Sequence, residues 1–511
     1  MSLSVELVLY WIANQADPAQ KSHEDARSFL DTIHDWTVDE VDIFVQRIAE
    51  IGDLPLLPEV QIVLGALCRN VYAFARQGSL EQHQALLKRA GILYQRMGVE
   101  SQERHLLLAA MAIAGEREAI QNFALLFAAD PPVDPLHVGI AMAPLFQRAD
   151  FDAEELFPEI LKALAHPHAA SAALDLANFL FRNRRAAVHP AAEQFSQLNS
   201  LLKGVCARLK QVAVGEPDQQ PTQHQIAESI AIAASLCDAL GLIGDPQAKT
   251  ALRDALEVPH RRIRVEAAAA LARMEDDDAV AALVELAEHP GVRLRAIAYA
   301  EELGLLEHID PQLSTPLANA EAELACYLAE PQQLGSAPTS MELIDEREIA
   351  WPSYDHPQQC YLFRFTYQMG EASYTNVGMA GPLVHAFHVD LTRLPIDDLY
   401  AIFAGWQAEH PDIREIPASQ MDESHQELIE QLSARIMEQG LQLQTLSALG
   451  EFFGEPALIA TASDGENVGA VVAGINDAAW FPHDGSSTRP LGPDEAWCIW
   501  KGRRLLSAFN E

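Results

Sequence analysis

An internal repeat near residue 240 constrains the fold of this chain more than any other feature. The segment "ALGLIGDPQAKTALRDAL" at residues 239–256 aligns with "ALARMEDDDAVAALVELA" at residues 270–287 after a shift of about 31 positions. In this register alanines, leucines and one aspartate recur: Ala239, Leu240, Asp245, Ala248 and Leu252 fall on Ala270, Leu271, Asp276, Ala279 and Leu283. A repeat of this length is typical of stacked helical hairpins, in which each unit packs on its neighbours.

A second register gives the order of elements within one repeat. "IRVEAAAAL" at residues 263–271 aligns with "VRLRAIAYA" at residues 292–300, so that Arg264 falls on Arg293 and Ala267 on Ala296. Each unit then contains a helix, a short Gly/Asp turn, a second helix and a loop with proline and a Val-Arg step. The four alanines at 267–270 bury little apolar area each. They have high helix propensity and allow neighbouring helix backbones to approach closely.

These repeats resemble the HEAT repeat family, and most closely its short form of about 30 residues found in bilin-lyase-like proteins. The resemblance covers roughly residues 226–305. In the family the arginine of the Val-Arg step usually pairs with an aspartate at a turn of the stack. The resemblance therefore implies a structural role for Arg264 and Arg293, with Asp245 and Asp276 as their expected partners.

Helical periodicity continues upstream, although the repeats there are degenerate. Residues 104–130 and 156–180 each show apolar residues at helical spacing. The polar stretch "VGEPDQQPTQHQ" at residues 214–225 is expected to be an insertion between repeats, with a conformational hinge as the alternative. We predict a mainly α fold, a right-handed α-solenoid of HEAT-like helical hairpins over residues 1–329. Its repeats are degenerate over residues 1–211 and clear over residues 226–305.

The composition changes near residue 330 and indicates a second, smaller α+β domain. "EPQQLGSAPTS" at residues 330–340 is typical of a linker. Beyond it, alternating aromatic and β-branched residues predict strands at 360–369, 372–381 and 383–391. Amphipathic helices are expected at 395–410 and 424–440, and hairpins around Asp464-Gly465 and Lys501-Gly502. Residues 341–511 form this acidic α+β domain, for which we find no family resemblance.

Charge limits the classes of partner. The chain has 73 acidic and 35 basic side chains, a formal net charge of −38. Residues 331–511 hold 26 acidic and 9 basic side chains, a balance of −17 over about a third of the length. Such a surface repels phosphate backbones and anionic lipids, so we predict neither nucleic acid nor membrane as a partner. Two explanations of the acidity stay open: solubility or salt adaptation, and selection for a cationic partner.

Cysteine usage and hydropathy indicate a cytoplasmic protein. Six scattered cysteines without a CxxC pair fit a reducing compartment. The N-terminal "MSLSVELVLYWIANQAD" lacks a basic segment and a cleavage site, and is expected to be the first amphipathic helix. We expect no stretch to approach the roughly 20 apolar residues needed to span a bilayer.

Motifs for catalysis are missing. No Walker loop, GxGxxG, GxSxG or HExxH occurs in the sequence. His385 and His388 come nearest to a metal pair, but residues three apart on a strand point to opposite faces, so we expect packed or edge histidines. "TNVGMAGP" at residues 375–382 is expected to be a glycine-rich turn whose glycines serve loop geometry. We predict no catalytic residue, no cofactor and no metal.

One helix offers a candidate binding strip. Along residues 278–289, Ala279, Leu283 and Leu286 form the expected core stripe, and Val280 and Val284 widen it. One repeat earlier the equivalent positions are Lys249 and Arg253. We call these four residues the predicted strip: Lys249, Arg253, Val280 and Val284. Packing between repeats is the alternative explanation.

Two function hypotheses follow. The first is a non-enzymatic protein–protein interaction scaffold or adaptor that binds a basic or amphipathic protein through the concave face and the acidic C-terminal domain. The second is an enzyme or a chromophore-handling factor, with its site in the C-terminal domain around His385, His388 or the glycine turn. The second rests on fold analogy alone. A cavity with convergent polar groups would favour it, and an open groove would favour the first.

Overall fold

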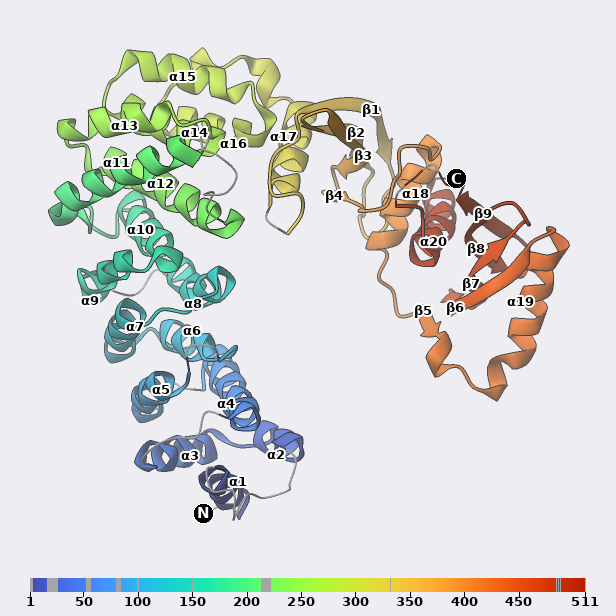
Figure 1. The fold of residues 1–511 in the computed structure, drawn as a ribbon, viewed down its shortest axis with the longest axis horizontal. Helices are drawn as coiled ribbons and strands as arrows, with labels where there is room; N and C mark the ends of the chain where they lie inside the picture. The colour runs from blue at the N-terminus through green and yellow to red at the C-terminus, as the bar shows by residue number, and fades with distance from the viewer. Residues whose placement is uncertain are drawn as a thin grey trace. The chain divides into compact units, whose positions relative to one another are not determined.

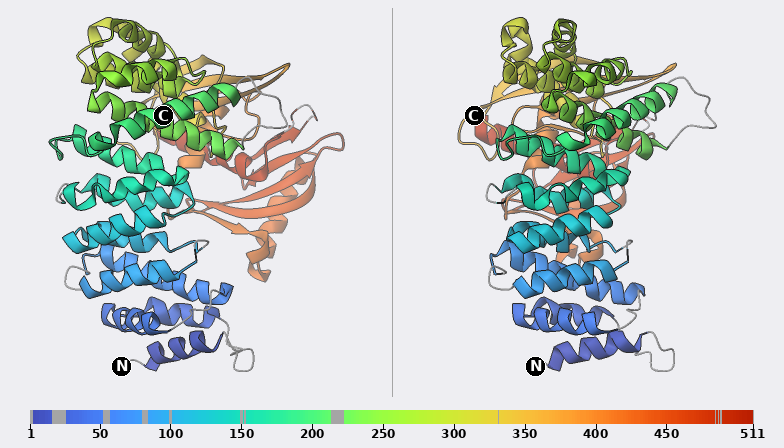
Figure 2. Two further views of the ribbon diagram at one scale, coloured as in Figure 1. Left: turned by 60° about the vertical axis from the view of Figure 1, so that its left-hand side comes forward. Right: turned by 90° about the vertical axis from the view of Figure 1, so that its left-hand side faces the viewer.

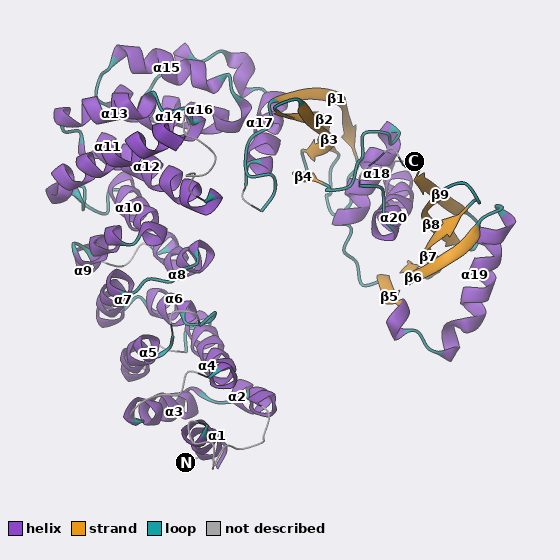
Figure 3. Ribbon diagram, in the orientation of Figure 1, coloured by secondary structure: helices purple, strands orange, loops and turns teal. Residues whose placement is uncertain are grey.

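The computed structural model describes most of the chain. The described residues are 3–15, 26–51, 57–79, 84–98, 101–148, 151, 153–212, 222–330, 332–483, 485, 487 and 489–510. The chain divides into two compact units, Met1–Leu283 and Val284–Glu511. It is mostly helical, and within the described residues strands occur only after residue 339 (Figure 3). The expected order, a helical part followed by a part with sheets, is confirmed.

The described residues of the first unit are mainly helical (Figure 1). They are α1 (Leu3–Asn14), α2 (Leu30–His34), α3 (Val38–Glu50), α4 (Pro58–Arg76), α5 (Gln84–Arg96), α6 (His105–Ala114), α7 (Arg117–Ala129), α8 (Pro135–Gln147), α9 (Ala153–Leu156), α10 (Pro167–Arg182), α11 (Phe195–Val212), α12 (Gln223–Ile243), α13 (Lys249–Leu256), α14 (Arg261–Arg273) and the start of α15 (Asp277–Ala287).

These helices stack in two rows (Figure 2). In one row α2, α4, α6, α8, α10, α12 and α14 each pack on the next, and in the other row α1, α3, α5, α7 and α9 do the same. α11 packs on both α12 and α13. The first row continues from the helices before residue 211 into the helices of the clear repeats, and the degenerate repeats expected over residues 1–211 stay a prediction.

The alanine run lies where two helices of this row meet. Ala267 to Ala270 on α14 are all buried. A Cβ atom on Gly241 of α12 would lie 2.6 Å from the Cβ and 2.7 Å from the Cα of Ala270. Small residues on both helices therefore permit this close approach, and dispersion contacts between the backbones replace bulky side chains.

Overpacking the alanine run is expected to destabilise the first unit. Ala268→Phe and Ala269→Phe each insert a ring at a fully buried position, and we expect a loss of about 1–3 kcal/mol in the free energy of unfolding. Ala281→Phe, at an exposed position of α15, is the matched control and should change it by about 0.5 kcal/mol or less. Denaturant unfolding followed by circular dichroism measures both. Equal midpoints for all three variants would disprove close packing at the alanine run.

Residues 214–221 of the expected insertion at 214–225 lie outside the described residues. Its end is described: α12 begins at Gln223, behind a capping box between Thr222 and Gln225.

α12 corrects one hydropathy expectation. Its segment His224–Ile243 is long and apolar enough, by length and composition, to cross a membrane, contrary to the expectation from the sequence. More than half of the apolar window is buried within the protein, and α12 packs on α10, α11 and α14. These contacts are those of a core helix.

The second unit joins helices to two antiparallel sheets with strand orders β1-β2-β3-β4 and β5-β6-β7-β8-β9. After the end of α15, its elements are α16 (Pro290–Glu302), α17 (Pro316–Leu328), β1 (Ser340–Ile349), β2 (Gln358–Met369), β3 (Ala372–Ala380), β4 (His385–Ala386), α18 (Ile396–Gln407), β5 (Ile413–Pro417), α19 (Gln426–Glu438), β6 (Gln442–Phe452), β7 (Glu455–Ser463), β8 (Val468–Gly474), β9 (Ala478–His483) and α20 (Pro493–Asn510).

Helices and sheets alternate in layers. On the first sheet, Phe363 packs with Leu324 of α17, while Leu362, its neighbour on β2, packs with Phe403 of α18. On the second sheet, Ile459 packs in one cluster with α20, and Leu458 packs in another with α19. The period of two along β2 and β7 thus gives each sheet two apolar faces, and α18 and α20 lie between the sheets.

The two inner helices touch backbone to backbone. A Cβ atom on Gly405 of α18 would lie 1.9 Å from the carbonyl oxygen of Cys498, and one on Gly502 of α20 would lie 1.8 Å from that of Ala401. The expected hairpin around Lys501-Gly502 is therefore wrong, because Gly502 serves helix packing inside α20. The hairpin around Asp464-Gly465 is confirmed and joins β7 to β8.

Two further expectations need correction. The strand expected at 372–381 is confirmed as β3, so the glycine-rich turn expected at 375–382 is wrong as far as Ala380, and a Cβ on Gly378 would lie 2.9 Å from the Leu324 side chain. Of residues 383–391 only His385 and Ala386 form a strand. The backbone that follows is held by the Asn376 amide, which donates to the carbonyls of Phe387 and Val389.

The segment at residues 330–340 is bonded to the first sheet. The Tyr367 hydroxyl donates to the Ser336 carbonyl at 2.6 Å, and the Thr339 amide donates to the Thr366 carbonyl at 2.8 Å. The division into a solenoid over 1–329, a linker and a domain over 341–511 stays a prediction.

Candidate interaction site

The predicted strip lies on second helices of two repeats. Lys249 and Arg253 are one turn apart on α13, and Val280 and Val284 are one turn apart on α15. Arg253 is exposed, and the other three residues are half-buried. Partner binding by these residues stays a prediction.

Arg253 also has a structural partner. Its Nη2 lies 2.6 Å from Oδ2 of Asp276, whose side chain is 7% exposed just before α15 begins. The pair joins α13 to the start of the next second helix. Arg104 with Asp130, and Arg182 with Asp238, are similar arginine–aspartate pairs earlier in the first unit. Arginine–aspartate ion pairs therefore recur between helices of the first unit.

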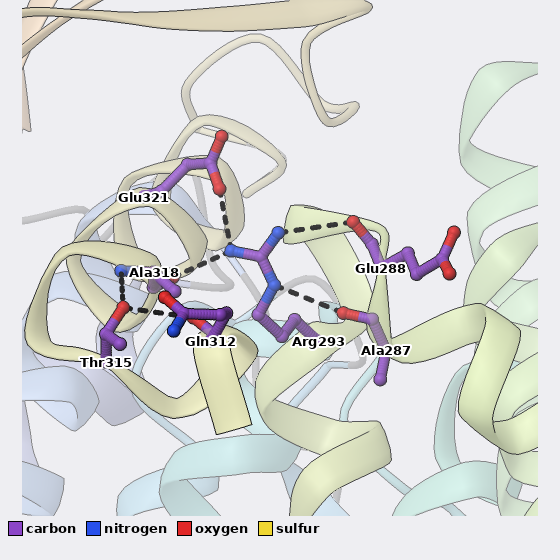
Figure 4. A network of polar contacts seen from close by, with 7 residues as sticks. All are labelled: Ala287, Glu288, Arg293, Gln312, Thr315, Ala318 and Glu321. Atoms are coloured by element: carbon purple, nitrogen blue, oxygen red, sulfur yellow. Dashed lines mark hydrogen bonds and ion pairs between the residues drawn. The ribbon is translucent and has the colours of Figure 1, made fainter. Parts of the chain in front are cut away.

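The arginine at the second Val-Arg step makes a larger network (Figure 4). Arg293 of α16 is buried, and its Nη1 lies 2.6 Å from Oε2 of Glu321 on α17. It also donates to the carbonyls of Ala318 at 2.8 Å, Ala287 at 3.1 Å and Glu288 at 3.2 Å. A cation at the C-terminal end of α15 is favourable for the helix dipole.

This network corrects the expected partner of Arg293. The acid is Glu321, and the turn aspartate Asp276 is bound by Arg253. The internal repeats recognised in the sequence end near residue 305, and Glu321 lies on the next helix, α17, so the alignment could not suggest it as a partner. The structural role of Arg293 is nevertheless as expected, because its guanidinium is used for contacts between helices.

His385 is packed, as expected for an isolated histidine. Its ring stacks on Trp406 with centroids 4.0 Å apart, and its Nδ1 lies 3.0 Å from the Tyr327 hydroxyl. Burial, with a smaller contribution from His388, lowers the pKa of His385 to about 4. The ring is therefore neutral near pH 7. Among the described residues, no group of three or more His, Cys, Asp or Glu side chains has the geometry to hold a metal ion.

The tryptophans of the second unit are mostly core residues. Trp351, Trp497 and Trp500 are buried, and Trp480 is half-buried. Trp406 is 46% exposed, so one of the five keeps a free surface next to His385.

A surface pocket lies elsewhere in the second unit, and the sequence did not indicate it. Its volume is about 460 Å³. Residues after α18, residues of β5 and one residue of α20 line it: Ala408, Glu409, His410, Pro411, Ile413, Glu415 and Lys501. Lys501 is 7% exposed and stacks on Trp497, with its Nζ 5.6 Å from the ring centroid. These residues come from three elements, and no local sequence motif joins them.

Comparison with known proteins identifies one part of the chain. Residues 223–304 match the family model of HEAT repeats, close to the 226–305 range expected from the residues. No curated protein and no solved structure matches the chain. The family match lies on α12–α16 and does not reach the two sheets.

Proposed function

We propose that the protein is a non-enzymatic protein-interaction scaffold or adaptor. The observation that carries this proposal is the HEAT repeat match, because HEAT repeats are generally protein-interaction scaffolds. In this proposal the hairpins form a right-handed α-solenoid, and the predicted strip lies on its concave face. The protein works in the cytoplasm.

Charge defines the partner that we propose. The net charge of −38, with −17 beyond residue 330, favours a basic or amphipathic protein. Nucleic acid and anionic membranes are disfavoured by the same charge. The partner contacts both the predicted strip and the acidic C-terminal part.

Affinity purification from the native cell, followed by mass spectrometry, tests this function. We expect to recover a basic protein. Its recovery should fall as the salt concentration rises from 50 to 300 mM, because salt shortens the distance over which charges on the two proteins attract each other to below about 10 Å. Val280→Asp and Val284→Asp should each reduce recovery several-fold. Ala281→Asp, at an exposed position between them, is the matched control and should not.

Two results would contradict parts of this proposal. Tight binding of duplex DNA at physiological salt in a mobility-shift assay would contradict the electrostatic argument. If both valine variants recover the same partner as the native protein, the scaffold function stands but the predicted strip is not where the partner binds.

The pocket at Lys501 favours a second candidate, a factor that handles a small ligand. An ammonium group beside Glu409, His410 and Glu415 is a set of convergent polar groups. Inorganic phosphate is the simplest probe. A rise in the unfolding midpoint with phosphate that Lys501→Met abolishes would support this candidate, and an equal rise in both proteins would reject it.

A further inference from the structure

The part of the chain from α17 onward contains the same arrangement twice. α17, β1, β2, β3, β4 and α18 follow one another in the same order as α19, β6, β7, β8, β9 and α20. In each set the four strands form an antiparallel meander. The first helix packs on the outer face of its sheet, and the last helix packs on the inner face.

The contact between the two inner helices supports this correspondence. Gly405 of α18 lies against Cys498 of α20, and Gly502 of α20 lies against Ala401 of α18. Gly405 comes four residues after Ala401, and Gly502 comes four residues after Cys498. The glycine of each helix therefore lies at the same spacing from the residue that the other helix's glycine contacts. The contact is thus reciprocal, as expected for two similar halves related by an approximate two-fold axis.

The two halves differ at one edge. In the second half, β5 pairs antiparallel with β6, from Ile413 opposite Phe452 to Pro417 opposite Ala448. β1 is the counterpart of β6, and in the described part of the chain no strand pairs with its other edge. β1 has ten residues, whereas the edge strands β5, β9 and β4 have five, six and two. β1 therefore has the longest free edge of the four edge strands in the two sheets.

The side chains of β1 indicate what this edge accepts. β1 carries the acids Glu342, Asp345, Glu346 and Glu348 and a single basic residue, Arg347. Antiparallel pairing with β1 of a second copy would place acids near acids, which is unfavourable. A strand with basic side chains would instead place opposite charges across the pair.

We propose that the free edge of β1 binds an extended, basic segment of a partner protein, which adds a strand to the first sheet as β5 does to the second. Backbone hydrogen bonds supply affinity, and the acids of β1 supply selectivity. This inference rests on the proposed function and names the partner's chemistry and one site of contact.

A labelled ten-residue peptide that alternates lysine and valine is the probe, and its fluorescence anisotropy with the full chain measures binding. We expect saturable binding that weakens with salt, and at least tenfold weaker binding when the amide groups on one edge of the peptide are N-methylated. A peptide that alternates glutamate and valine should not bind. Equal binding of the methylated peptide would overturn strand addition.

Charge reversal locates the site. Glu346→Lys with Glu348→Lys should weaken binding at least tenfold. Glu427→Lys with Glu430→Lys, at exposed positions of α19, makes the same change in net charge and should weaken it less than twofold. Equal effects of the two pairs, or a dimer of the native protein in sedimentation, would overturn the proposal. If the full chain does not bind the peptide but still recovers the cellular partner through the predicted strip, this inference is rejected and the proposed function stands.

Discussion

Gly502→Ala is expected to lower the free energy of unfolding of the second unit by about 3 kcal/mol. The new methyl carbon would lie 1.8 Å from the Ala401 carbonyl oxygen and 2.6 Å from its carbonyl carbon. Both atoms belong to the backbone of α18, so no side chain can rotate to make room, and the two helices have to separate. Separation also loosens the clusters that α18 and α20 form with the two sheets.

Gly204→Ala is the matched control for this substitution. Gly204 also lies inside a helix, α11, and a Cβ there meets nothing within 4 Å. Helix propensity alone then favours alanine by up to about 1 kcal/mol. The two variants should therefore change stability in opposite directions, as measured by denaturant unfolding with tryptophan fluorescence. A Gly502→Ala protein as stable as the parent would disprove the backbone contact between α18 and α20.

The same glycines explain where prediction from the sequence failed. Gly502 and Gly378 were assigned to turns, because glycine most often marks a turn in a sequence without an alignment. In the structure Gly502 admits a neighbouring helix and Gly378 lies under Leu324. Both roles depend on a segment about 50 to 100 residues away in the sequence, which local composition does not reveal.

The repeats were predictable because their contacts are local. The alignment of residues 239–256 with 270–287 placed the second helices α13 and α15 correctly, and the alanine run is buried as expected. The alternation in residues 360–369 predicted β2 for a similar reason, since its period of two follows from the two buried faces of the sheet. Long-range pairing of strands was not predictable from such patterns.

The candidate sites were less predictable than the fold. The strip followed from the repeat register alone, whereas the pocket at Lys501 and the free edge of β1 arise from elements distant in sequence. Charge was the one sequence signal that bears on both the strip and the free edge of β1, because an acidic surface favours a basic partner at each.

Arg293→Met is expected to lower the free energy of unfolding by about 3–5 kcal/mol. The side chain of Arg293 is 5% exposed, so its removal leaves the Glu321 carboxylate and three carbonyl oxygens without this donor in a site that water reaches poorly. Arg293→Lys should recover only part of the loss, because one ammonium group cannot reproduce the planar set of donors. Arg295→Met, at an exposed position two residues away, should cost about 1 kcal/mol or less.

The pairing with Glu321 can be separated from the contacts with the carbonyl groups. Glu321→Gln removes the charge of the carboxyl group, so in the Arg293→Met background it should cost less than it does alone. A double-mutant cycle measures this coupling, and we expect about 1–3 kcal/mol between the two positions. Additive effects would show that Arg293 acts mainly through the carbonyls of Ala287, Glu288 and Ala318, which join the end of α15 to the first turn of α17. A loss for Arg293→Met no larger than that for Arg295→Met would disprove the network itself.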